Sequence, residues 1–169
     1  MFDGPHHMVR AFLRIVYPVK AMTLLYLMAG SMANANGPEP FIPFAVDITL
    51  SPLARQTLLR RHEAITVAVF YDGLPTPATQ KEATEGEIAL GQEKTTLSAT
   101  GGRATISGRG FQKKNLDRIM PDSARILINV YSARRSGPDN LLDCSSHEGP
   151  LPRQNGQIIP VHCRLIEEQ

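Results

Sequence analysis

The densest group of chemistry-capable side chains lies in residues 143–148, which read Asp-Cys-Ser-Ser-His-Glu. Nucleophile, base and carboxylate types stand side by side there. The partners of a catalytic triad normally converge from separate segments, so adjacency along the chain argues against a triad. The chain also has no Gly-x-Ser-x-Gly motif, which would expose a strained serine. We interpret this group as a polar strand end or loop, and we assign no catalytic residue.

Two histidines, His147 and His162, flank the cysteines of this region. Together with Asp143 or Glu148 they could supply nitrogen and oxygen ligands to a metal ion. Nothing in the spacing makes the two imidazoles face each other. Because side chains alternate along a strand, His162 is expected to point away from the face that carries its neighbour. We therefore expect no metal and no cofactor, and keep both histidines as candidate ligand or partner contacts.

Three arginines complete the set of candidate contacts. Arg109 lies in Gly108-Arg109-Gly110, which lacks the further glycine of a dinucleotide loop and the Gly-Lys-Ser/Thr of a phosphate loop. A turn or β-bulge explains those glycines better. Arg134 and Arg135 precede a Gly-Pro turn and could grip an anionic group from a strand end, because loop tips often carry function. They could equally be charges that protect a strand end from aggregation.

Cys144 and Cys163 are the two cysteines of the chain. In an oxidising compartment an isolated pair is most simply a disulfide. Residues 159–165 and 142–144 both alternate so that each cysteine shares a face with apolar neighbours. A bridge would close a loop of about 20 residues, which is worth about 3 kcal/mol on the chain-entropy model. The spacing fits no C-x-x-C redox motif and no zinc motif, so the alternative is a pair of buried free thiols.

The redox environment is predicted from the start of the chain. An apolar run over residues 21–33 follows three basic residues and ends in Ala33-Asn34-Ala35. This is the pattern of a cleavable secretory signal peptide. We expect residues 1–35 to be the signal peptide and residues 36–169 to form one domain, periplasmic or secreted. The run is shorter than the about 20 apolar residues that span a bilayer, although an uncleaved anchor is the alternative.

Two further features of residues 1–35 concern the start of the signal peptide and its resemblance to a lipoprotein signal. A start at Met8 instead of Met1 would give a more ordinary signal peptide that keeps the three basic residues. Residues 28–31 resemble a bacterial lipoprotein signal, but such a signal needs a cysteine where this chain has Ser31. Since a hydroxyl replaces the thiol that would carry the lipid, lipidation is excluded.

Removing the leader changes the charge of the protein. The whole chain has 18 Lys+Arg and 16 Asp+Glu. Residues 1–35 contain Arg10, Arg14, Lys20 and Asp3, which leaves 15 residues of each sign and a net charge of zero. A neutral domain has no long-range field that attracts nucleic acid or anionic lipid. We expect neither a nucleic-acid partner nor stable membrane insertion after cleavage.

Hydrophobic periodicity predicts the elements that position these residues. Period-two alternation indicates strands, and the Ser51-Pro52 pair is typical of a helix start. The predicted helix covers 52–62, and residues 111–120 contain one or two helical turns. Residues 85–93 continue over 95–99 beyond a bulge near Gly91, and Gly101-Gly102 turns the chain into a return strand. The strands are expected over 44–50, 64–71, 85–93, 103–107, 125–133, 141–145 and 157–166.

About seven short strands with one or two brief helices predict an antiparallel β-sandwich of Ig-like or transthyretin-like architecture. Architecture alone does not fix function. We interpret the chain as a non-catalytic binding or protein-interaction module of a bacterial cell envelope. Its partner would be an envelope protein or peptide, recruited at an exposed strand edge by β-addition. The alternatives are a small hydrolase, or a metal-binding periplasmic protein, that uses His147 or His162.

Overall fold

Alternating apolar and polar residues build the first strand, and the same alternation builds the rest of the molecule. The computed structural model describes residues 41–168. Strand β1 (Phe44–Leu50) turns Phe44, Val46, Ile48 and Leu50 inward, and all four side chains are buried. The signal peptide predicted over residues 1–35, and the start of the segment that leads from it to β1, lie outside the described residues.

Helix α1 (Pro52–Arg60) follows β1 as predicted, because Ser51 caps it. The Ser51 hydroxyl accepts a hydrogen bond from the Ala54 N–H at 3.0 Å, and Pro52 occupies the first helical position, where its missing N–H costs nothing. The helix ends at Arg60, two residues before the predicted end. It buries Ala54, Thr57 and Leu58 against the sandwich and leaves its arginines exposed.

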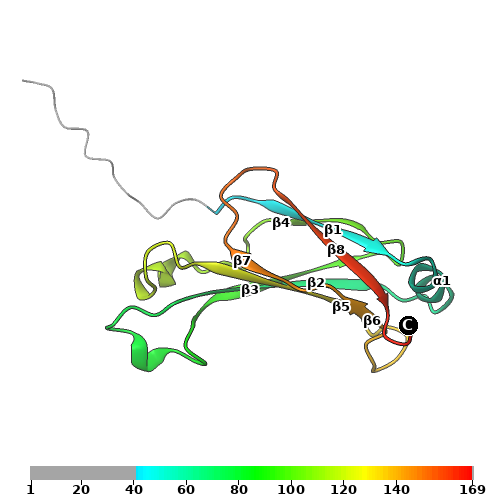
Figure 1. Ribbon diagram of the computed structural model, residues 1–169, viewed down its shortest axis with the longest axis horizontal. Coiled ribbons are helices and arrows are strands. Elements are labelled where there is room, and N and C mark those ends of the chain that lie inside the picture. The colour runs from blue at the N-terminus through cyan, green and yellow to red at the C-terminus, as the bar shows by residue number, and fades with distance from the viewer. Residues whose placement is uncertain (1–40, 169) are drawn as a thin grey trace, which may run out of the picture. The chain divides into compact units, whose positions relative to one another are not determined.

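In the part of the chain that the structure describes, eight strands form two four-stranded sheets that pack face to face (Figure 1). The first sheet has the order β4-β1-β8-β6 and the second has the order β3-β2-β5-β7. Helix α1 lies at one end of the sandwich, and the 3₁₀ turns η1 and η2 lie near the other (Figure 1). The predicted β-sandwich is thus confirmed. The remaining elements are β2 (Ile65–Gly73), η1 (Gln80–Glu82), β3 (Ile88–Leu97), β4 (Gly102–Ile106), η2 (Lys113–Arg118), β5 (Arg125–Ser132), β6 (Leu142–Cys144), β7 (His147–Pro150) and β8 (Ile158–Leu165).

Two features of the topology differ from the expected all-antiparallel pairing with a return strand after Gly101-Gly102. Strand β1 pairs with β8 in parallel, although every other strand pair is antiparallel. Strand β4 does not return alongside β3; it pairs with β1 in the other sheet. Gly101 and Gly102, with φ of 76° and 110°, carry the chain across the side of the sandwich. Such φ values strain a residue with a Cβ, so glycine is required there.

The core lies between the two sheets and is made of the inward face of each strand. Ile65, Val67, Val69 and Tyr71 of β2 are all at most 1% exposed. Tyr71 packs edge-on against Phe41 and Phe111 at centroid distances of 5.7 and 5.3 Å. Burial and the neighbouring Glu93 carboxylate raise the pKa of the Tyr71 hydroxyl. This aromatic cluster closes the end of the core opposite α1.

Candidate functional site

The cysteine pair is a disulfide, as predicted. Cys144 of β6 and Cys163 of β8 lie directly opposite each other in register, and their sulfurs are bonded. Cys163 is 4% exposed, whereas Cys144 is half-buried. Because β6 has only three residues, the bridge fixes this short edge strand to the sheet. Disulfides are typical of proteins that fold outside the reducing cytosol.

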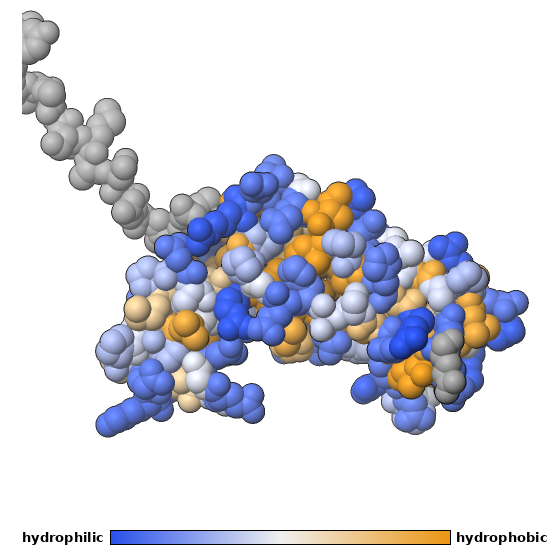
Figure 2. All heavy atoms as spheres, viewed as in Figure 1, coloured by the Kyte–Doolittle hydropathy of each residue, from blue (hydrophilic) through white to orange (hydrophobic). Residues whose placement is uncertain are grey.

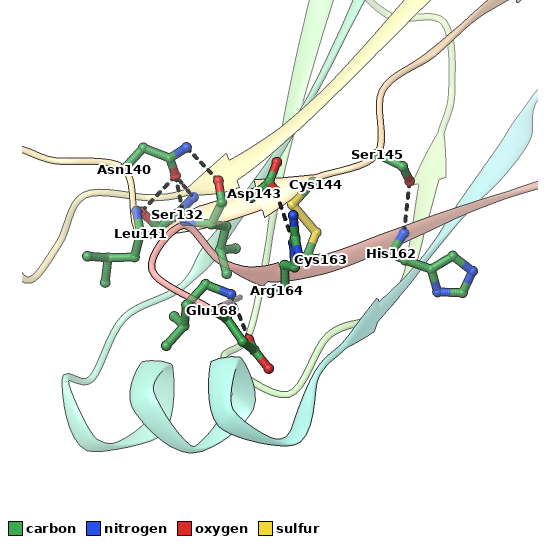
Figure 3. Close-up of a disulfide and its surroundings, with 12 residues drawn as sticks. Ser132, Asn140, Leu141, Asp143, Cys144, Ser145, His162, Cys163, Arg164 and Glu168 are labelled. Atoms are coloured by element: carbon green, nitrogen blue, oxygen red, sulfur yellow. Dashed lines mark hydrogen bonds and ion pairs between the residues drawn. A yellow bond between two sulfur atoms is a disulfide. The ribbon is translucent and has the colours of Figure 1, made fainter.

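The disulfide lies in a surface hollow of about 550 Å³. Figure 3 shows its polar surroundings. The Arg164 guanidinium donates to the Asp143 carboxylate at 3.1 Å, and the His162 backbone N–H donates to the Ser145 hydroxyl at 3.1 Å. The charged groups beside the hollow are therefore engaged with each other. The His162 imidazole points away from the disulfide (Figure 3).

The two candidate histidines do not converge. His162 lies on the exposed outer face of the first sheet, opposite Thr49 of β1. His147 begins β7 in the second sheet and pairs with Ile128, whose side chain is fully buried, so the imidazole lies on the inward side. Within residues 41–168 no group of three or more His, Cys, Asp or Glu side chains is arranged to hold a metal ion.

The candidate arginines are also separated. Arg109 is exposed in the loop after β4, near the aromatic end of the core. Arg134 and Arg135 follow β5 at the opposite end of the sandwich, beside α1. The sequence-predicted contacts therefore do not form one site.

A buried carboxylate that accepts four hydrogen bonds was not predicted from the sequence. Glu63 is only 4% exposed, and its carboxylate accepts hydrogen bonds from the backbone N–H groups of Ala64, Arg135 and Ser136 at 2.9, 3.0 and 2.8 Å. The Ser136 hydroxyl adds a fourth at 2.7 Å. Arg134 has φ of 59°, and the loop forms a backbone nest of the kind that binds anions.

The pKa of Glu63 records this environment. Burial acts to raise the pKa, but the backbone and hydroxyl hydrogen bonds outweigh burial and lower it from 4.5 to about 2. The carboxylate is therefore charged at any ordinary pH. Since Glu63 fills the nest, that position is closed to an external anion. No local pattern marks Glu63, because three of its four hydrogen bonds come from Arg135 and Ser136 of a distant loop.

A second acidic group lies near the other end, around Asp72 of β2. Burial and the Glu87 carboxylate raise the pKa of Asp72, while Arg125 opposes them. Arg125 forms ion pairs with both Glu87 and Glu148. Asp72 and Glu87 line a shallow pocket of about 270 Å³. Glu82 and Arg118 line the same pocket and form an ion pair at 2.6 Å. Most of these charges are neutralised internally.

The outer face of the second sheet carries an apolar pair at its centre. Phe70 of β2 lies directly opposite Leu127 of β5, and both side chains point away from the core. Leu127 is 37% exposed and Phe70 is half-buried. Gln92 and Glu148 extend this row onto β3 and β7. Asn129 of β5 lies two residues nearer to α1 than Leu127, and it pairs with the buried Ala68 of β2.

The arrangement of this face matches the general anatomy of a protein interface, in which an apolar centre is surrounded by polar residues. We call these side chains the β2–β5 face. Its residues are Thr66, Ala68, Phe70, Gln92, Lys94, Leu127, Asn129, Tyr131 and Glu148.

In comparisons with known proteins, no family model, no curated protein and no solved structure matches this chain. Among the described residues, none of the helices is long and apolar enough to cross a membrane.

Proposed function

We propose that the chain is a secreted, periplasmic, non-catalytic binding or protein-interaction module of the bacterial cell envelope. The β2–β5 face is its contact surface. The single observation that carries this proposal is the Phe70–Leu127 pair at the centre of that face, with polar side chains around it. Aromatic and aliphatic side chains exposed together on a sheet face are typical of places where a partner protein packs.

Two further observations support the proposed setting. The Cys144–Cys163 disulfide is the bridge expected in an oxidising compartment such as the periplasm. The proposed signal peptide over residues 1–35 would deliver the chain there. Both features agree with a domain that is exported before it folds.

The β2–β5 face is a better candidate for the contact surface than the edges of β3, β6 and β7. Residues 108–112 cover part of β3, since Phe111 bridges to Gly91 and the Gln112 N–H donates to the Leu90 carbonyl at 2.7 Å. The edge strands β6 and β7 have only three and four residues. A partner strand added there would form few backbone hydrogen bonds.

The alternative functions have less support. His147 and His162 belong to different sheets and face different directions, so neither supports the other in a hydrolase or metal site, and in residues 41–168 neither belongs to a group of three metal-ligating side chains. The charged neighbours of His162, Asp143 and Arg164, are paired with each other. We therefore favour binding over catalysis.

The test is affinity capture from a bacterial envelope fraction by the full chain carrying an affinity tag and expressed with its own leader. Wild-type protein is compared with Leu127→Lys, which places a charge at the centre of the β2–β5 face without touching the core. Thr105→Lys, on the outer face of the first sheet, is the matched control. The proposal requires a partner that Leu127→Lys loses and Thr105→Lys keeps. Equal capture by all three proteins would contradict it.

A further inference from the structure

Two pairs of arginines that are far apart in the sequence meet at one end of the sandwich. Arg60 and Arg61 end α1 and begin the connection to β2, whereas Arg134 and Arg135 follow β5. The Ala133 N–H donates to the Ala64 carbonyl at 2.8 Å, which places the two connections side by side. All four arginines are exposed. We call this surface the basic end.

Glu63 holds the basic end together. Its buried carboxylate stands between the two arginine pairs and binds the backbone N–H of Arg135 at 3.0 Å and that of Ser136 at 2.8 Å. Because the backbone satisfies this carboxylate, it does not need the guanidinium groups. The arginine side chains are left to face outward.

No ion pair in residues 41–168 engages the four arginines of the basic end. The ion pairs of residues 41–168 engage other arginines, namely Arg103, Arg118, Arg125, Arg153 and Arg164. The two connecting segments carry one exposed acidic residue, Asp139. Figure 2 shows hydrophilic and hydrophobic residues interleaved at this end, and Leu59 of α1 is 49% exposed there.

The basic end is continuous with the β2–β5 face. The Arg134 guanidinium lies over the Tyr131 ring at 5.9 Å from the ring centroid, and Tyr131 is the last outward residue of β5 on that face. A partner that covers the Phe70–Leu127 pair and extends along β5 would therefore reach Arg134.

We propose that the basic end binds an acidic segment of the partner protein, an inference that rests on the proposed interaction function. Arginine forks pair with carboxylates in bidentate geometry, and a local concentration of positive charge speeds the approach of an acidic partner. An acidic peptide fits better than an anionic membrane. The exposed large apolar side chains of α1, Leu53 and Leu59, are six positions apart and therefore lie on different faces, whereas an interfacial helix needs one continuous apolar face.

The test measures fluorescence anisotropy of a labelled oligoglutamate peptide with the full-length protein at low salt. Wild-type protein should bind the peptide, and added salt should weaken binding. The double variants Arg60→Ala/Arg61→Ala and Arg134→Ala/Arg135→Ala should each lower the affinity by about tenfold, because each removes two exposed charge contacts. Lys113→Ala/Lys114→Ala removes a basic pair of η2 at the other end and should bind as wild type.

Several outcomes would overturn the inference. One is absence of salt-sensitive peptide binding, another is an equal loss in the lysine variant, and a third is binding to phosphatidylglycerol vesicles but not to the peptide. Thermal melts of each variant check that the fold is intact.

The same variants in the envelope capture separate the two proposals. If Leu127→Lys loses the partner and the arginine variants keep it, the acidic-segment inference fails and the proposed function stands. If Leu127→Lys also keeps the partner, the proposed function fails.

Discussion

The carboxylate of Glu63 accepts the backbone N–H of Arg135 at 3.0 Å and so joins positions 72 residues apart in the sequence. Three further hydrogen bonds, from Ala64 and Ser136, complete the environment of this buried group. The contact connects the end of α1 to the loop after β5, and it presents four arginines on one surface. A structural carboxylate thereby organises a surface that we propose to be functional.

Glu63 should control the acid stability of the domain. Its folded-state pKa of about 2 lies below the ordinary 4.5, so its charge stabilises the fold above pH 4.5 and this contribution is lost as the pH falls toward 2. The depressed pKa corresponds to about 3 kcal/mol in the free energy of unfolding. Urea denaturation between pH 7 and pH 2.5 measures it.

Glu63→Gln should therefore be less stable than wild type by about 2 to 3 kcal/mol at pH 7. Its free energy of unfolding should also fall less steeply than that of wild type as the pH is lowered, which we call the acid slope. Glu167→Gln, at an exposed position, is the control and should follow wild type. If Glu63→Gln kept both the neutral stability and the acid slope of wild type, the role assigned to this carboxylate would be wrong.

The disulfide should contribute substantially to stability. The cysteines are 19 positions apart, and a loop of this size predicts a loss of about 3 kcal/mol when the bridge is removed. Cys144→Ser/Cys163→Ser should show this loss in denaturant titration. Adding a reductant should reduce wild-type stability and leave the double variant unchanged. A double variant as stable as the oxidised wild type would contradict the prediction.

Gly91 and Gly102 offer a matched test of close backbone approach. Their φ values are nearly equal, at 111° and 110°. A Cβ at Gly91 would lie 2.1 Å from the carbonyl oxygen of Gly110, whereas a Cβ at Gly102 would have no atom within 4 Å. Gly102→Ala should cost about 1 to 2 kcal/mol for the left-handed backbone alone. Gly91→Ala should cost more, because residues 108–112 must also move from β3, and thermal melts should rank the two in that order.

The sequence predicted the parts of the fold that local patterns encode. Alternation placed Phe44, Ile65 and Ile126 on buried faces, and Ser51-Pro52 placed the start of α1, because both effects act between near neighbours. The cysteine pairing followed from there being two cysteines in a chain with a predicted signal peptide, and the alternation supported it. Alternation says which face a residue occupies but not which strand lies beside it. The parallel β1–β8 pair and the pairing of β4 with β1 in the other sheet therefore could not be predicted from the alternation.

The basic end and the β2–β5 face were harder to predict from the sequence than the fold was. Arg134 and Arg135 were identified as candidate contacts, but nothing in the sequence joined them to Arg60 and Arg61. That connection depends on backbone N–H groups, which nearly every residue carries and which leave no mark in the composition. The apolar centre at Phe70 and Leu127 was hidden for a related reason, since in both strands the two faces are rich in apolar residues.

The β2–β5 face is proposed as the surface on which a partner protein packs. The most direct measurement is photo-crosslinking in living bacteria, with a benzophenone amino acid at position 127 of the full chain or, as a control, at position 105 on the other sheet. A contact at this face predicts a discrete crosslinked band from position 127 that position 105 does not give. No adduct at 127, or the same adducts at both positions, would contradict the account.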